Sequence, residues 1–215
     1  MIEIKHRETG EVLLKVDANS LEKAKLAGKQ LAGADLADMN LSGADFHNTN
    51  LRGCDLTGAL LEGANLHSAC LNDACLDKAD VSHADFTDAF IQKASLNGIR
   101  AHRAIFRYAK LAESDCSNGD FTSADCSIAD FRANLFEANF EQADLRGADF
   151  RGANLTAANL AGANMTNAKM ADANLTRTRM DGTIGTHGKP LGGAMASRSP
   201  GRKKSKKKPW WQLWS

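Results

Sequence analysis

Residues 34–66, which read ADLADMNLSGADFHNTNLRGCDLTGALLEGANL, decide the fold of this chain. A large apolar residue returns at every fifth position, as at Leu36, Leu41 and Phe46, and a small residue, most often Ala, stands two places before it. The same pattern begins at Leu21. Helices place apolar residues three and four apart and strands place them two apart, so a period of five requires a backbone that turns once per repeat. The sequence therefore predicts a solenoid.

The repeat can be written Ala-(Asp/Asn)-Leu-x-x, and it resembles the pentapeptide-repeat family over residues 20–180. A run of about 30 consecutive repeats is not expected by chance. The resemblance implies an all-β fold, a right-handed quadrilateral parallel β-helix with one repeat on each face and four repeats in each coil.

The physics of the pattern leads to the same core. If the central residue and the small residue both point inward, four faces enclose a narrow apolar column, and the Asp or Asn between them faces solvent. Coils then stack as a parallel ladder, so residues twenty apart are expected about 4.8 Å from each other, and about eight coils make a rod near 40 Å long. One predicted column consists of Leu26, Phe46, Leu66, Phe86 and Phe106.

Two places depart from the pattern. Between Phe131 and Leu135 the central residues are four apart, which predicts a tightened corner or a slight bend. At Ile99–Ala101 the sizes are inverted, because bulky Ile takes the small site and Ala takes the centre. We expect that coil to be locally distorted.

The two ends of the chain differ from the repeats. Residues 1–19 contain two alternating apolar and charged stretches around a turn, which predicts a β-hairpin that caps the first coil. Residues 20–181 are expected to form the β-helix. Residues 182–215 are rich in Gly, Ser, Lys and Pro, which is typical of a flexible linker, and they end in a tryptophan motif.

Charge and cysteine content bear on the compartment. The net charge of +1 combines a mildly acidic repeat region with a tail of +7 over residues 181–215. No apolar run approaches the roughly 20 residues that span a bilayer, and the N-terminus lacks the apolar core of a signal peptide. We expect a bacterial cytoplasmic protein, or one peripheral at the inner membrane. The five cysteines are interpreted as small apolar fillers: Cys54, Cys70, Cys75, Cys116 and Cys126.

The sequence contains no motif for catalysis, for a cofactor or for a metal. It has no phosphate-binding glycine loop, no HExxH, no nucleophile elbow and no Cys and His at metal-ligand spacing. Asp35, Asp45 and Asp80 recur before the central residue and resemble candidates for acid–base or calcium chemistry. The repeat spreads such residues over all four outer faces, which favours a structural role and predicts a protein that is not an enzyme.

Function is then expected on the outer surface. The best-understood proteins of the resembled family confer quinolone resistance or toxin immunity, imitate DNA and bind DNA gyrase, so a DNA-mimicking modulator of DNA gyrase is one hypothesis. A charge of −6 over residues 1–180 is shallow for a duplex, which carries about one charge per 1.7 Å.

A second candidate surface is basic and lies around the inverted repeat. Its residues are Arg100, His102, Arg103, Arg107, Tyr108 and Lys110. A partner with an anionic feature could dock there, and the alternative is an ordinary solvated face.

The third candidate surface is the tail, whose basic and aromatic residues are typical of peripheral membrane attachment. Nucleic-acid binding, recognition by a protein partner, and a purely solubilising role are the alternatives. The residues concerned are Lys203, Lys204, Lys206, Lys207, Lys208, Trp210, Trp211 and Trp214. Together the sequence predicts a non-enzymatic binding scaffold for an unidentified protein partner, with attachment to an anionic membrane or a partner through the tail.

Overall fold

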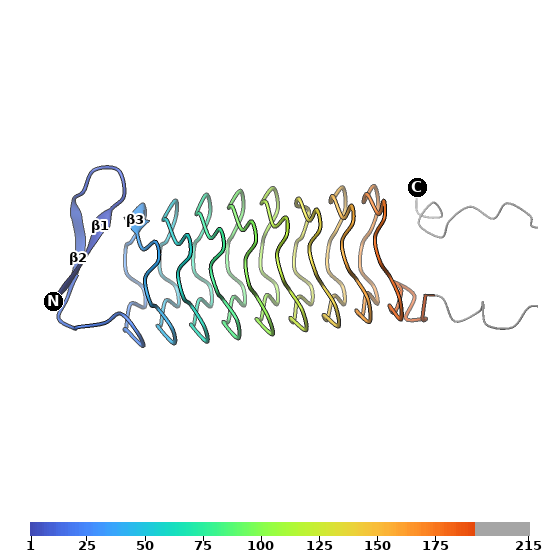
Figure 1. The fold of residues 1–215 in the computed structure, drawn as a ribbon, viewed down its shortest axis with the longest axis horizontal. Helices are drawn as coiled ribbons and strands as arrows, with labels where there is room; N and C mark the ends of the chain where they lie inside the picture. The colour runs from blue at the N-terminus through green and yellow to red at the C-terminus, as the bar shows by residue number, and fades with distance from the viewer. Residues whose placement is uncertain (192–215) are drawn as a thin grey trace, which may run out of the picture.

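The computed structural model describes residues 1–191, which wind into a four-sided rod of stacked coils (Figure 1). Single parallel bridges join residues twenty apart, from Lys25 with Asp45 to Asn164 with Ile184. Twenty residues are four repeats of five, so each repeat supplies one face of a coil. No helix occurs in residues 1–191, and the predicted all-β solenoid is confirmed.

Each repeat turns its corner through a type II β-turn. The N–H of the small residue donates to the carbonyl of the preceding central residue, as Ala24 does to Leu21 at 3.1 Å. The second residue after the centre has a positive φ, 55° at Asn48 and 65° at Gly58. Gly and Asn adopt this conformation with the least strain. A turn at every fifth residue is the physical origin of the five-residue period.

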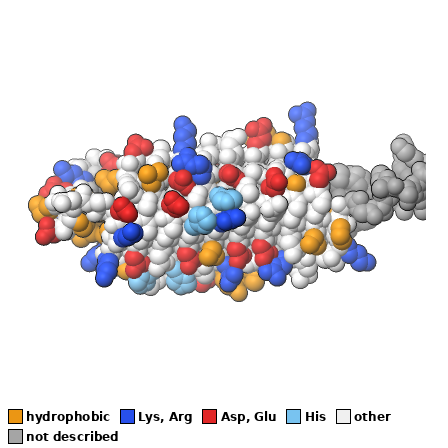
Figure 2. All heavy atoms as spheres, turned by 60° about the horizontal axis from the view of Figure 1, so that its bottom comes forward, with side chains coloured by type: hydrophobic (Ala, Val, Ile, Leu, Met, Phe, Trp, Pro, Cys, Tyr) orange, Lys and Arg blue, Asp and Glu red, His pale blue; other side chains and the backbone are white. Residues whose placement is uncertain are grey.

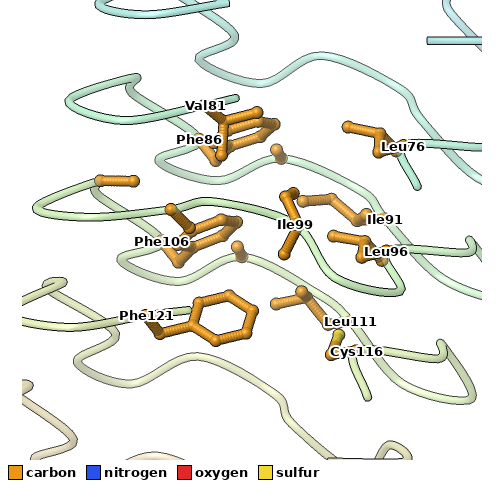
Figure 3. Packing of buried hydrophobic residues seen from close by; sticks show 14 of the residues in the cluster. Leu76, Val81, Phe86, Ile91, Leu96, Ile99, Phe106, Leu111, Cys116 and Phe121 are labelled. Atoms are coloured by element: carbon orange, nitrogen blue, oxygen red, sulfur yellow. The ribbon is translucent and has the colours of Figure 1, made fainter. Parts of the chain in front are cut away.

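The interior is a continuous apolar column. Phe86 and Phe106 stack with ring centroids 4.8 Å apart and planes inclined by 4°, which confirms the predicted spacing. Figure 3 shows Phe86 over Phe106 and, on the opposite side of the core, Leu76 over Leu96. All four side chains are fully buried. The core is therefore built by stacking equivalent residues of successive coils.

The N-terminal hairpin is present as predicted. Strand β1 (Ile2–His6) pairs antiparallel with β2 (Val12–Val16) and, on its other edge, with β3 (Ala34–Asp35) of the first coil. Ile4 is fully buried in the core. The hairpin therefore covers the N-terminal end of the rod with an apolar side chain and a paired backbone (Figure 1).

The C-terminal boundary at residue 181 needs correction. The bridge ladder extends to Ile184, which also pairs antiparallel with Pro190. The Leu191 N–H donates to the Thr183 carbonyl at 2.7 Å, and Thr183 is fully buried. The sequence pattern ends before the backbone pairing ends, because a bridge needs backbone N–H and C=O groups and no particular side chain. Residues 182–191 thus close the rod instead of starting the tail.

The missing residue near Phe131 produces the predicted tightened corner. The Ala133 N–H donates to the Phe131 carbonyl at 2.7 Å, two residues back, whereas the other corners span three residues. Asp115 bridges to Asn134, nineteen residues on, and Asn134 bridges to Asn154, twenty residues on. One corner absorbs the deletion and the ladder continues.

The prediction of a distorted coil at Ile99–Ala101 is wrong. The bridges on both sides of this repeat keep the regular register, and Ile99 and Ala101 are fully buried. Gly119 occupies the small site one coil later, and a Cβ there would lie 3.1 Å from the Cγ2 of Ile99. Figure 3 shows Ile99 between the columns of Phe106 and Leu96. The space for Ile99 comes from Gly119 in the neighbouring coil, and the sequence of one repeat does not reveal it.

The cysteines divide into two groups. Cys54, Cys116 and Cys126 are buried, and burial raises the pKa of the Cys116 thiol to about 12. The interpretation as core fillers is wrong for Cys70 and Cys75, which are only partly buried. Both stand directly before a central residue, where the repeat directs side chains outward.

Candidate interaction surface

The outer surface of the rod is made from three positions of each repeat. These are the residue before the centre, which lies on a face, and the two residues after the centre, which form the corner. The central and small residues are buried throughout most of the rod. Any recognition chemistry must therefore come from convex faces and corners.

The Asp or Asn before each centre closes the corner. Its side-chain oxygen accepts the N–H two residues on, as Asp55 does from Thr57 at 2.9 Å and Asn154 does from Thr156 at 3.2 Å. Such Asx turns satisfy an N–H that the ladder does not use. Asn154 also donates from Nδ2 to Oδ1 of Asn134 in the preceding coil at 3.0 Å. These bonds give the recurrent acidic and amide residues a structural role.

Arginine side chains pair with acidic side chains in the C-terminal half of the rod. Arg151 Nη2 lies 2.6 Å from Asp149 Oδ2, and Arg146 makes the equivalent pair with Asp144. The hydrogen bond from Arg151 is the main cause that lowers the pKa of Asp149. The arginines are half-exposed or more, so each pair contributes little stability. Their larger effect is to reduce the negative field of these faces.

Four of the six histidines lie on corners of the coils, at His47, His67, His83 and His102, and His6 ends β1. His47 Nδ1 is 2.9 Å from Asp45 Oδ1, and the rings of His83 and His102 meet edge to face at 6.1 Å. Within residues 1–191, no group of three or more His, Cys, Asp or Glu is placed to hold a metal ion. No helix in that part of the chain is long and apolar enough to cross a membrane.

The predicted basic cluster is divided among several sides of the rod. Arg100 lies on one face, and Lys110, half a coil further, lies on the opposite face. The first corner after Arg100 holds His102 and Arg103. Arg107 and Tyr108 form the next corner. The six residues therefore do not make one patch.

Three cations of that predicted cluster have partners on the rod itself. Arg100 Nε is 3.2 Å from Asp80 Oδ2, and Arg107 is paired with Asp125. Lys110 Nζ lies 4.5 Å from the ring centroid of Phe90. These contacts hold the cations close to their own faces.

The structure adds one feature that the sequence interpretation missed, which we name the corner ridge: Arg107, Tyr108, Ile128 and Arg146. Tyr108 and Ile128 are 46% and 54% exposed, and these residues line a shallow depression of about 470 Å³. Figure 2 shows apolar side chains bordered by Lys or Arg and by Asp or Glu along the lower edge of the rod. The available signal was a bulky apolar residue at the second corner position, where the other described residues with a positive φ are Gly, Ala or polar.

The candidate residues of the tail lie outside the described part of the chain. They are Lys203, Lys204, Lys206, Lys207, Lys208, Trp210, Trp211 and Trp214. Their assignment to membrane, nucleic acid or protein stays a prediction.

A family model for pentapeptide repeats matches the chain in eight copies. The matches cover residues 20–53, 40–77, 71–100, 133–170 and 148–184. Residues 101–132, which include Tyr108 and Ile128, lie between the matched segments. A comparison with curated proteins finds no match.

Solved structures of repeat proteins are also similar to the chain. HetL, a pentapeptide repeat protein involved in heterocyst differentiation regulation in the cyanobacterium Nostoc sp. strain PCC 7120, is 30% identical, with 78% of this chain and 87% of HetL covered and a TM-score of 0.38. A pentapeptide repeat protein from the Arabidopsis thaliana thylakoid lumen is 31% identical, with 46% and 69% covered and a TM-score of 0.45. A trypsin-treated form of QnrB1, a plasmid-mediated fluoroquinolone resistance protein, is 21% identical, with 72% and 83% covered and a TM-score of 0.46.

Proposed function

Because the chain belongs to the pentapeptide-repeat family, we propose that it is a non-enzymatic scaffold whose rigid outer surface binds a protein partner. The observation that carries the proposal is the hydrogen bonding between coils. In the repeat centred on Leu26, the Leu26 N–H donates to Asp45, the Gly28 N–H donates to His47, and the Asp45 N–H donates back to Ala24. The same three bonds recur along the ladder. They fix the spacing of every outward side chain.

A surface of this kind suits binding better than catalysis. Preorganised side chains lose little conformational entropy when a partner docks, so more of the contact energy appears as affinity. The depressions found on the described rod are shallow and open, as at the corner ridge. Catalysis usually relies on a concave site that excludes water. These features together support a binding role.

The basic tail extends the proposal to attachment. Seven Lys and Arg and no acidic residue lie in residues 192–215, followed by three Trp near the end. Each Lys or Arg near an anionic leaflet is worth about 1 kcal/mol. The tail would therefore bring the rod to an anionic membrane surface or to a partner of the same charge. Sedimentation with anionic vesicles tests binding to a membrane surface, and a gel shift with duplex DNA tests binding to an anionic partner.

The second hypothesis, a DNA-mimicking modulator of DNA gyrase, has less support from the charges. Residues 1–191 hold all 26 acidic residues and 20 of the 27 Lys and Arg, a net charge of −6. Several of the carboxylates also pair with arginine, as Asp144 and Asp149 do. The elongated shape remains in its favour. A supercoiling assay with DNA gyrase tests it, and inhibition by the isolated rod at micromolar concentration would support it.

The scaffold proposal is tested by co-purification from cells. The full-length chain is compared with a chain that ends at Leu191, which keeps the closing turn of the rod intact. We expect both forms to retain the same defined protein by mass spectrometry. Loss of every protein partner from the shortened chain would contradict the proposal and assign binding to the tail.

A further inference from the structure

The corner ridge joins apolar side chains from successive coils. The Tyr108 N–H donates to the Ser127 carbonyl at 3.2 Å, and the Ile128 N–H donates to the Arg146 carbonyl at 2.8 Å. These bonds place Tyr108 and Ile128 one coil apart on the same corner. Both are about half-exposed. Two exposed apolar side chains therefore stand one coil apart beside the shallow depression.

The backbone makes this choice of residues unfavourable for stability. Tyr108 and Ile128 have φ values of 60° and 59°. Many polar residues of the rod share this conformation, but Ile128 is the only β-branched residue that does so within residues 1–191, and its Cβ substituents crowd the backbone there. Two other coils place Asn48 and Asn167 at this corner, with φ of 55° and 62°. A strained and exposed Ile128 beside an exposed Tyr108 points to a role outside folding.

The charges beside the ridge define what it would attract. The side chains of Arg107 and Arg146 are 50% and 60% exposed, whereas those of their partners Asp125 and Asp144 are 26% and 28% exposed. The guanidinium groups are therefore the more exposed members of these two ion pairs. Arg146 uses Nε and Nη2 for Asp144, so its Nη1 can donate to a further carboxylate. A partner's carboxylates would meet the two guanidinium groups first.

We propose that the corner ridge is the docking site for an amphipathic helix of a protein partner. Apolar side chains of that helix pack against Tyr108 and Ile128, and its carboxylates pair with Arg107 and Arg146. The inference rests on the proposed scaffold function. Coils repeat at about 4.8 Å, so the two arginines lie about 10 Å apart along the rod. A helix spans about 10.5 Å from residue i to residue i+7 and 5.4 Å per turn.

The spacing favours a helix over a strand as the occupant. Side chains on one face of a strand repeat every 6.6 to 6.8 Å or so, a spacing that does not match the coil spacing of about 4.8 Å. A helix turn stays near the coil spacing over two coils. The expected partner sequence therefore has acidic residues at i and i+7 and apolar residues at i+3 and i+4.

Selection from a displayed library of helical peptides, randomised on one face, tests the proposal with the full-length protein as bait. We expect enrichment of the acidic and apolar pattern just described. The selected peptides should bind the double variant Tyr108→Asn, Ile128→Asn at least about tenfold more weakly. Asn occupies the same corner at Asn48 and Asn167, so this variant should fold with an unchanged or higher denaturation midpoint.

The matched control is Leu60→Asn. Leu60 is also apolar and 43% exposed, but it lies on another face. Peptide binding should be unchanged in this variant. Selection of a different pattern, or equal binding to the double variant, would overturn the proposal, as would duplex DNA binding that depends on Tyr108.

The failure of this inference can be told from the failure of the scaffold proposal. If the double variant still retains the protein partner captured by the rod ending at Leu191, the partner binds elsewhere on the rod and only the ridge assignment is wrong. If neither the rod nor its variants retain a protein, the scaffold proposal itself is contradicted.

Discussion

A single Asp or Asn side chain closes most corners of the rod. Because its oxygen accepts the N–H two residues on, the residue type before each centre is set by backbone geometry more than by chemistry with a ligand. Asp85 illustrates this, since Oδ1 accepts both the N–H and the hydroxyl of Thr87 at 2.9 and 2.5 Å. Most of these polar side chains therefore stabilise the fold, and the positions that depart from the pattern are the better candidates for binding a partner.

Asn154 tests the value of one such side chain. Replacement by Ala removes its acceptor for Thr156 and its donor to Asn134. The free energy of unfolding should fall by about 1–2 kcal/mol, measured by urea denaturation. Asn154→Asp is the control, because it keeps the acceptor and loses only the donor. An equal loss in both variants would show that the corner bond has no value.

Gly119 and Ile99 should be energetically coupled. Gly119→Ala places a methyl group 2.7 Å from Phe121 and 3.1 Å from Ile99, which should cost about 1–3 kcal/mol of unfolding free energy. Ile99→Ala alone should cost about 2–5 kcal/mol through the cavity it leaves. The double variant should lose less than the sum by about 0.5 kcal/mol or more. Strict additivity in a double-mutant cycle would show that Gly119 does not provide the space for Ile99.

At the scale of the coil, the repeats behave as interchangeable units that tolerate local changes at corners. The ladder shifts from twenty to nineteen residues at the short corner and then returns to twenty. The hairpin β1–β2 joins the first coil by backbone pairing with β3, and residues 182–191 close the last coil. The end elements therefore protect the core without altering the repeat geometry.

A glycine inserted between Arg132 and Ala133 should restore an ordinary corner. The Ala133 N–H could then reach Phe131 across three residues, as at the other corners. We expect a thermal midpoint equal to or above that of the parent. As a control, a glycine inserted between Arg151 and Gly152 lengthens a regular corner and should lower the midpoint. The hypothesis fails if the two insertions destabilise the rod equally.

The acidic side chains make the stability of the whole rod dependent on pH. Hydrogen bonds from Arg151 and His47 are the main causes that lower the pKa of Asp149 and Asp45. A carboxyl with a lowered pKa in the folded state stabilises it above the unfolded pKa of about 3.9 and loses that effect as pH falls through its folded value.

The urea midpoint should therefore stay nearly constant from about pH 7 to pH 5 and fall below about pH 4. Asp149→Asn keeps an acceptor for the Arg151 N–H but no longer titrates, so it should show a smaller fall. The same slope in the parent and in the variant would exclude Asp149 from this effect.

How much the sequence predicts differs between the core and the surface. The position of Phe86 over Phe106 follows from the five-residue period together with the four repeats per coil that the family resemblance implies. The regular coil at Ile99 was not predictable from its own repeat, since Gly119 twenty residues later supplies the space. The corner ridge was missed for a different reason. Tyr108 and Ile128 are twenty residues apart and so neighbours in the predicted ladder, but the repeat pattern describes the core positions and leaves the corner positions nearly free.

For the whole molecule, we propose that the outer surface of the rod holds the partner, whatever the tail contributes. Hydroxyl-radical footprinting of the full-length protein, with and without the partner captured from cells, tests it directly. We expect partner-dependent protection of Tyr108 and Ile128, which are about half-exposed in the rod alone. Unchanged reactivity at every side chain of residues 1–191, with protection confined to Trp210, Trp211 and Trp214, would contradict it.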